Sequence, residues 1–143
     1  MRDSCSIINP ILDNINVLSN IAVDIFNQLE EELYLTGLTI DDLQPCHLQN
    51  FYDFLLDLIH MNQGLLSALG ISQPNVNIIC AIAQNYSLRG KITYSDKCEH
   101  AFIILSPNFI DDDLAKLINE LKAHNFSVTV TSLCGKWNGV RVE

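Results

Sequence analysis

The segment from Tyr94 to His100, "YSDKCEH", gathers residue types that take part in metal binding and catalysis. Thiolates and imidazoles bind zinc, and carboxylates, lysines and imidazoles serve as general acids or bases. The apolar segments on either side, "KIT" and "AFIIL", predict short strands. The segment therefore has three readings: a metal site, a catalytic loop, or a plain connection between two strands. Its reactive side chains are Asp96, Lys97, Cys98, Glu99 and His100.

A metal site finds little support in the spacing of cysteine and histidine. Cys46-His47 and Cys98-x-His100 are the close Cys/His pairs of the chain. A structural zinc site takes four ligands, usually from two paired clusters with characteristic spacing, and neither pair has that spacing. We therefore expect no metal ligands, and a joint use of Cys98 and His100 is left open.

Catalytic and phosphate-binding motifs are missing as well. No GxSxG is present, and His60 and His124 fall late in predicted helices, where histidine favours the helix C-terminus or faces water. The six glycines form neither GxGxxG nor GxxxxGK[ST]. The segment 134–139, "CGKWNG", predicts a turn between strands rather than a phosphate nest, with Asn138-Gly139 supplying positive φ. Residue chemistry alone indicates no active site.

The bulk properties bound the class of protein. The 143 residues are 48% hydrophobic and 17% charged, which suits one folded domain, residues 1–143. A net charge of −9 argues against nucleic acid and anionic membranes as partners. No apolar run is long enough to cross a bilayer, and the N-terminus shows no signal-peptide pattern. Five dispersed cysteines without CxxC favour a reducing, cytoplasmic location.

The elements that must position these residues follow from the hydrophobic periods. Apolar spacing of three and four predicts helices over 10–34, 48–69 and around 76–83. Ser72 can cap the third helix, and Gly70 and Asn125 suit left-handed helix ends. Strands are expected over 91–95 and 100–106, then a helix within 106–126, with Asp111, Asp112 and Asp113 in its first turn. Further strands are expected over 126–133 and 140–143. The order predicts an α+β fold with a small antiparallel sheet of about four strands covered by helices.

One long segment carries a family resemblance. Residues 58–93 contain Met61-Asn62-Gln63, then "LLSALGIS" over 65–72, a helix around Ile79-Cys80, and Lys91-Ile92-Thr93. In order and spacing they resemble the C-terminal part of mevalonate kinase, in the GHMP kinase superfamily. Similar segments continue from about Ile8 to Val142. The resemblance implies a ferredoxin-like GHMP C-terminal domain and, for the family, ATP- and Mg-dependent phosphorylation of mevalonate in cytosolic isoprenoid and sterol synthesis.

The chain departs from the family in two ways. The family's N-terminal half, with the catalytic aspartate, the catalytic lysine and the ATP loop, has no counterpart in these residues, so no catalytic residue is transferred. After Lys91-Ile92-Thr93 the family has a glycine run, whereas this chain has side chains with a Cβ atom. Such residues resist the φ angles that glycine allows, and Asp96 and Glu99 would repel a phosphate. The degenerate phosphate-loop positions are Thr93, Tyr94, Ser95, Asp96 and Lys97.

Three functions remain open at this stage. The first is a mevalonate-kinase-like C-terminal domain without activity or cofactor of its own. The second is a repurposed interaction domain, for which a homodimer is the simplest way to cover an apolar face left open. The third is an enzyme assembled with a separate N-terminal kinase half.

Overall fold

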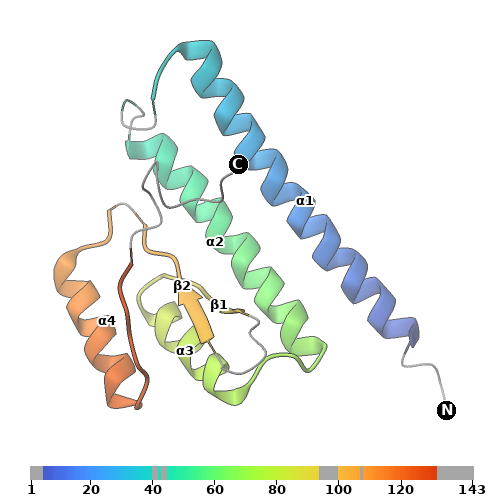
Figure 1. Ribbon diagram of the computed structural model, residues 1–143, viewed down its shortest axis with the longest axis vertical. Coiled ribbons are helices and arrows are strands. Elements are labelled where there is room, and N and C mark those ends of the chain that lie inside the picture. The colour runs from blue at the N-terminus through green and yellow to red at the C-terminus, as the bar shows by residue number, and fades with distance from the viewer. Residues whose placement is uncertain (1–4, 40–41, 43–44, 94–99, 107, 132–143) are drawn as a thin grey trace, which may run out of the picture.

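The computed structural model describes residues 5–39, 42, 45–93, 100–106 and 108–131, and it is an α+β fold. Two long helices lie side by side, and a shorter helix, a hairpin and a last helix gather below them (Figure 1). In chain order the elements are α1 (Cys5–Thr36), α2 (Pro45–Ala68), α3 (Pro74–Asn85), β1 (Gly90–Thr93), β2 (His100–Ile103) and α4 (Asp111–Ala123).

Helix α1 packs chiefly on α2, and it is longer than predicted. It begins at Cys5 rather than near Pro10, so the proline lies inside the helix. The predicted apolar stripe is confirmed, because residues such as Ile11, Leu18 and Leu29 are the half-buried ones on this helix. Phe26 meets Phe51 of α2 edge to face, with ring centroids 5.3 Å apart. The contact fixes the upper part of the helix pair.

The turn between α2 and α3 confirms the predicted glycine stop and corrects the predicted cap. Gly70 has φ +74, and the Ile71 N–H donates to the Leu66 carbonyl at 3.0 Å, as in a left-handed helix end. Pro74 opens α3, as expected, but its N-cap is Gln73, without a side-chain hydrogen bond to the helix. The Ser72 cap prediction is therefore wrong, because the Ser72 hydroxyl bonds to other side chains instead.

Strands β1 and β2 form an antiparallel hairpin, in which Gly90 pairs with Ile103 and Thr93 with His100. β1 begins one residue earlier than predicted, and its predicted last residues, 94–95, lie outside the described part of the chain; β2 ends at Ile103, three residues earlier than predicted. Alternate residues of β1 are buried, with Gly90 and Ile92 inward. The hairpin packs on α2 and α3, which leaves Lys91 and Thr93 half-buried on its other face. The predicted strand pair is thus confirmed at its centre.

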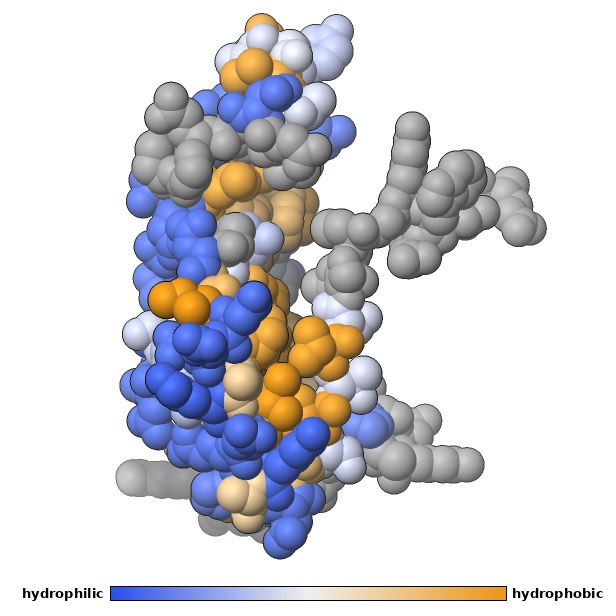
Figure 2. Space-filling view, turned by 90° about the vertical axis from the view of Figure 1, so that its left-hand side faces the viewer, coloured by the Kyte–Doolittle hydropathy of each residue, from blue (hydrophilic) through white to orange (hydrophobic). Residues whose placement is uncertain are grey.

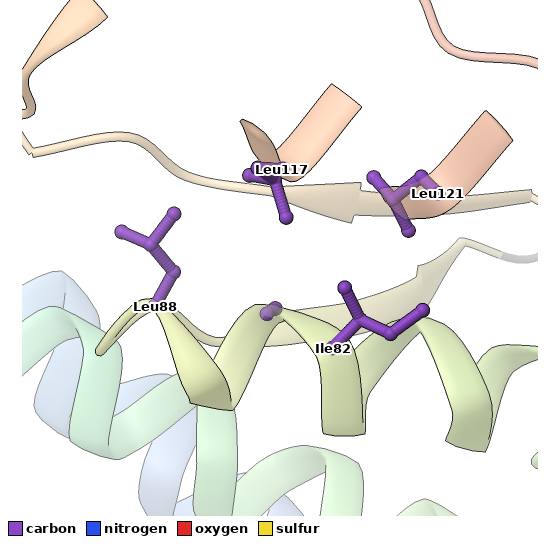
Figure 3. Packing of buried hydrophobic residues seen from close by; sticks show 5 residues of the cluster. Ile82, Leu88, Leu117 and Leu121 are labelled. Carbon is purple, nitrogen blue, oxygen red and sulfur yellow. The ribbon is translucent and has the colours of Figure 1, made fainter. Parts of the chain in front are cut away.

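The principal core lies between α3 and α4. Leu117 and Leu121 of α4 point toward Ile82 of α3 and toward Leu88, which follows that helix (Figure 3). Ala83 is fully buried beneath them. Partly buried apolar side chains close the cluster: Ile79, Tyr86, Ile103, Leu105, Phe109, Phe126 and Val128. The predicted inward side of α4 is confirmed.

Both ends of α4 agree with the sequence. Asp111, Asp112 and Asp113 occupy its first turn, where the helix dipole favours negative charge. Asn125 has φ +65 after the last turn, and the Phe126 N–H donates to the Leu121 carbonyl at 3.1 Å. Asn125 is therefore the left-handed residue that the sequence predicted.

The prediction of about four strands is not met within the described residues, where two strands pair. Residues 126–131 follow α4 without joining the sheet. Phe126 and Val128 are instead held by side-chain packing on the α3–α4 core. The alternation of apolar and polar residues therefore predicted that Phe126 and Val128 pack inward, but it did not supply a partner strand. The expected last strand, 140–143, and the expected turn at 134–139 lie outside the described residues.

Tyr86 joins the end of α3 to α4, and this contact has a pH dependence. Its hydroxyl donates to Glu120 Oε2 at 2.8 Å. That hydrogen bond raises the pKa of Tyr86, and burial and the nearby carboxylates of Glu120 and Asp113 raise it further. Because the folded pKa exceeds the unfolded value of about 10, the contribution is complete below that pH and is lost as pH rises through the folded pKa.

We therefore expect the melting temperature to fall more steeply above pH 10 in the wild type than in Tyr86→Phe. Thermal unfolding followed by circular dichroism from pH 8 to 11 measures this difference. Tyr86→Phe removes this hydroxyl alone, so the variant provides the control. Parallel curves for the two proteins would contradict the role given to this hydroxyl.

Candidate functional site

The hairpin end is where the sequence placed the degenerate phosphate loop. Thr93 is the one residue of that set within the described part of the chain, because Tyr94, Ser95, Asp96 and Lys97 lie outside it. The Thr93 hydroxyl points back into the hairpin and donates to the His100 carbonyl at 3.4 Å. The six residues 94–99 therefore connect two directly paired antiparallel positions. The flanks of the connection agree with the hairpin prediction.

A chain of hydrogen bonds starts at the buried side chain of Gln63 on α2. Its Oε1 accepts the backbone N–H of Ile92 in β1 at 2.9 Å. Its Nε2 donates to Ser72 Oγ at 2.8 Å, and Ser72 in turn donates to Asn77 Oδ1 of α3, also at 2.8 Å. Gln63 is only 6% exposed. One amide thus ties together α2, β1, the α2–α3 turn and α3.

The bond to Ile92 has a particular geometric meaning for the sheet. In an antiparallel pair, alternate residues direct their N–H groups toward the partner strand and away from it. Because the Ile92 N–H is given to Gln63, it lies on the edge of β1 remote from β2. The side chain of Gln63 occupies the position that a further strand would take. Helix α2 therefore closes this edge of the sheet at Ile92.

Next to this network lies an open pocket of about 420 Å³ between α2, α3 and the start of β1. Its cation is Arg89, whose Nη1 donates to the Leu88 carbonyl at 3.1 Å. Arg89 Nε is buried and has no hydrogen-bond partner among the described residues. The pocket lies at the Gly90 end of β1, about 10 Å along the strand from Thr93. It is therefore distinct from the degenerate phosphate loop. The lining residues are His60, Met61, Gln63, Gly64, Ser67, Asn77, Cys80, Ala81, Gln84, Arg89 and Gly90.

Cys80 lines this pocket but is not an activated nucleophile. Its Sγ lies 3.3 Å from the Gly90 carbonyl, and burial raises the pKa of its thiol. A raised pKa keeps the thiol protonated at neutral pH, which lowers its reactivity. The same approach explains the glycine at residue 90, because a Cβ there would lie 3.3 Å from the Cys80 sulfur. Cys80 serves the packing of α3 on β1.

The histidines of the described region have modest roles. His124 follows α4, and its Nδ1 lies 2.9 Å from the Glu120 carbonyl, as expected for histidine at a helix C-terminus. His60 is exposed at the pocket, in the second half of α2. His100 is exposed in β2, whereas Cys98 and the side chains of Cys46 and His47 lie outside the described residues. Among the side chains that are described, no three His, Cys, Asp or Glu residues cluster as a metal site would require.

Sequence reasoning noted Gln63 in the family-like segment without giving it a structural role. The available signal was its spacing, since Gln63 follows Ile59 by four residues and precedes Leu66 by three, which places it on the apolar stripe of the helix. Arg89 was not singled out either. The signal in that case was its isolation, because Arg89 follows 86 residues that contain no Lys or Arg.

The comparisons with known proteins returned no match to a family model, a curated protein or a solved structure. Within the residues that the structure describes, no helix is both long enough and apolar enough to cross a membrane. The candidate site is therefore characterised by its own geometry: a closed sheet edge, a hairpin end and a neighbouring pocket.

The geometry of Gln63 predicts a measurable cost for losing its amide. Gln63→Met keeps the length of the side chain but removes the acceptor for Ile92 and the donor to Ser72. We expect a loss of about 1–3 kcal/mol in the free energy of unfolding, because a buried N–H is left unpaired. Urea unfolding measures it.

The matched control is Gln84→Met, at an exposed glutamine of α3 on the rim of the same pocket. An exposed substitution of this kind changes stability by less than about 0.5 kcal/mol. Equal effects of the two substitutions would show that the Gln63 network does not hold the hairpin.

Proposed function

We propose that these residues form a mevalonate-kinase-like C-terminal domain of the GHMP type that transfers no phosphoryl group by itself. The observation that carries the proposal is the meeting of separately matched segments. Gln63, Ser72 and Ile92 come from three different parts of the resemblance, and one chain of hydrogen bonds joins them. Residues that match a family in order and spacing are expected to meet in this way when the spacing reflects a shared fold.

The proposed domain has a four-stranded sheet, and the closed edge constrains how that sheet would be completed. Because Gln63 occupies the edge of β1, further strands have only the free edge of β2 to pair with. The segment after α4 already packs Phe126 and Val128 on the core that also holds Ile103 of β2. Residues 126–131 do not pair with β2 in the described structure, so the third and fourth strands remain part of the proposal.

Inactivity follows from the hairpin connection and from the parts that phosphoryl transfer requires. The reaction depends on positioning a nucleotide and Mg²⁺ among preorganised charges. Residues 94–97, "YSDK", stand where the family has glycines, and Asp96 adds negative charge beside an anionic ligand. ATP and Mg²⁺ therefore belong to the family reaction rather than to this stretch of chain. The proposed location is cytoplasmic, and the proposed pathway is the family's isoprenoid and sterol synthesis.

We expect Mg·ATP and mevalonate, singly or together, to leave the melting temperature unchanged. The physical reason is that no preorganised phosphate site remains to favour the folded state by ligand binding. Differential scanning fluorimetry over a concentration series measures this, with Mg²⁺ and sodium chloride at equal ionic strength as the control. A saturable rise of several degrees would refute the proposed inactivity. Turnover on mixing with an isolated N-terminal kinase half would instead support assembly of an enzyme from two chains.

A second candidate function, an interaction domain, is favoured by the exposed apolar surface. Figure 2 shows a band of hydrophobic surface down the middle of the face that α4 occupies, next to a hydrophilic region. Ten apolar side chains are buried, and none of them is among the described side chains of α1. Contiguous apolar surface that stays open in a folded domain is typical of a partner site. Among the described residues, sixteen large apolar side chains are exposed: Ile7, Ile8, Leu12, Val17, Val23, Phe26, Tyr34, Leu35, Leu38, Phe54, Met61, Ile71, Ile78, Phe102, Ile110 and Val130.

The interaction role predicts that the native protein binds the dye ANS. We expect a blue-shifted rise in ANS emission while the unfolding transition stays cooperative, because the apolar surface belongs to the folded state. A molten globule would also bind the dye but would lose its near-UV circular dichroism, which therefore serves as the control. Native protein without dye binding would count against the interaction role.

A further inference from the structure

Helix α1 carries a second apolar stripe besides the one that packs on α2. We call it the exposed apolar stripe; it consists of Ile8, Leu12, Val23 and Phe26, which are 40%, 49%, 56% and 50% exposed. Spacings of four, eleven and three residues bring these side chains to one side of a helix with 3.6 residues per turn. Ser19, the small residue in the gap, satisfies its hydroxyl within α1 by donating to the Ile15 carbonyl. From Ile8 to Phe26 the stripe is about 27 Å long.

The exposed apolar stripe continues onto α2 at its upper end. Phe26 contacts Phe51 at 5.3 Å between ring centroids, and Phe51 contacts Tyr52 at 5.9 Å. Phe51 and Tyr52 are half-buried, and their rings extend the apolar surface onto α2. The apolar surface thus runs along α1 and ends on an aromatic cluster. Its length suits a partner helix of about five turns.

Carboxylates run beside the exposed apolar stripe. Asp13, Asp24 and Glu31 are spaced by eleven and seven residues, so they form a second line about 100° around the helix from Leu12 and Val23. All three are exposed. No Lys or Arg occurs between Arg2 and Arg89, whereas residues 3–88 contain ten Asp and Glu. The α1–α2 pair therefore presents apolar side chains within a negative field, into which β1 brings one half-buried cation, Lys91, near Leu18 and Ser19.

The negative charge around the exposed apolar stripe determines which kind of partner can bind there. A second copy docked through the same helix would bring carboxylates against carboxylates, since α1 has no cation to offer in return. From the charge pattern we propose that the exposed apolar stripe binds a protein segment that carries apolar side chains flanked by Lys or Arg, as in a basic amphipathic helix. The homodimer expected from the sequence is disfavoured on this face. The inference rests on the interaction-domain function and names the chemistry of its partner.

The probe is a fluorescein-labelled 18-residue amphipathic helix of leucine and lysine, titrated with the full chain and followed by anisotropy. We expect saturable binding that weakens as salt is raised from 50 to 500 mM, because the charges across the interface are screened. Two further peptides serve as controls. One has every lysine replaced by glutamate, and the other has the same composition in scrambled order; neither should bind.

Two valines of α1 provide a matched pair of variants. Val23 lies in the exposed apolar stripe, and Val17 is similarly exposed at 51% but lies about 120° away around the helix. We expect Leu12→Ser with Val23→Ser to weaken binding about tenfold or more, and Val17→Ser to change it less than about twofold. Asp24→Asn with Glu31→Gln should weaken binding and flatten its salt dependence. Circular dichroism confirms that each variant stays helical.

The possible results distinguish failure of the proposed basic partner from failure of the interaction-domain function. Binding that Leu12→Ser with Val23→Ser leaves unchanged overturns the inference. Sedimentation that shows a salt-independent dimer, dispersed by Val23→Ser and not by Val17→Ser, overturns it too but leaves the interaction-domain function standing. A monomer that binds neither the peptide nor ANS overturns both.

Discussion

The hydrogen bond from Ile92 to Gln63 is the constraint on which the arrangement of the elements depends. It places a helix side chain where a strand would otherwise pair, so α2 must lie along the edge of β1. Since a buried N–H without a partner is costly, the hairpin cannot move away from α2 without a replacement acceptor. The Nε2 group of Gln63 donates to Ser72 Oγ, and Ser72 in turn donates to Asn77 Oδ1. Gln63 therefore also positions the turn into α3.

The hairpin is therefore fixed from two directions. On its edge it meets α2 through Gln63, and on its buried face it meets α3 at Gly90, where the absence of a Cβ lets the Cys80 sulfur approach the strand. Beyond α3 the leucines of α4 complete the core. Helix α1 stands outside this set of contacts and packs chiefly on α2. Burial consequently decreases from the α3–α4 core toward α1, which leaves α1 the helix with the most open apolar surface.

The sequence predicted correctly the features that depend only on neighbouring residues of one helix. The apolar stripes, Gly70, Asn125 and the acidic first turn of α4 each need only a helix and its end, and all were confirmed. The Ser72 cap and the strand pairing of residues 126–131 were predicted wrongly, because each depends on side chains or strand edges in other elements. A serine two residues before a helix can bond either to the helix N-terminus or to side chains of the preceding turn. A segment with alternating polarity forms a strand only where a free strand edge is available to pair with it. The site itself was only partly predictable. Thr93 has a described position, but the pocket and the bridging role of Gln63 arise from three elements meeting.

The distribution of charged residues divides the chain into two regions that favour ligands of different charge. From residue 89 onward seven Lys and Arg balance seven Asp and Glu, whereas residues 3–88 carry ten acids and no Lys or Arg. Near Thr93 the cations that a phosphate would need must come from the hairpin or from elsewhere, since the α1–α2 pair can only repel it. The basic partner proposed above suits the same pair in two ways, since its charge is opposite and its apolar side chains can be buried against the exposed ones. We therefore propose recognition on the two long helices, while α3, α4 and the hairpin form the packed core.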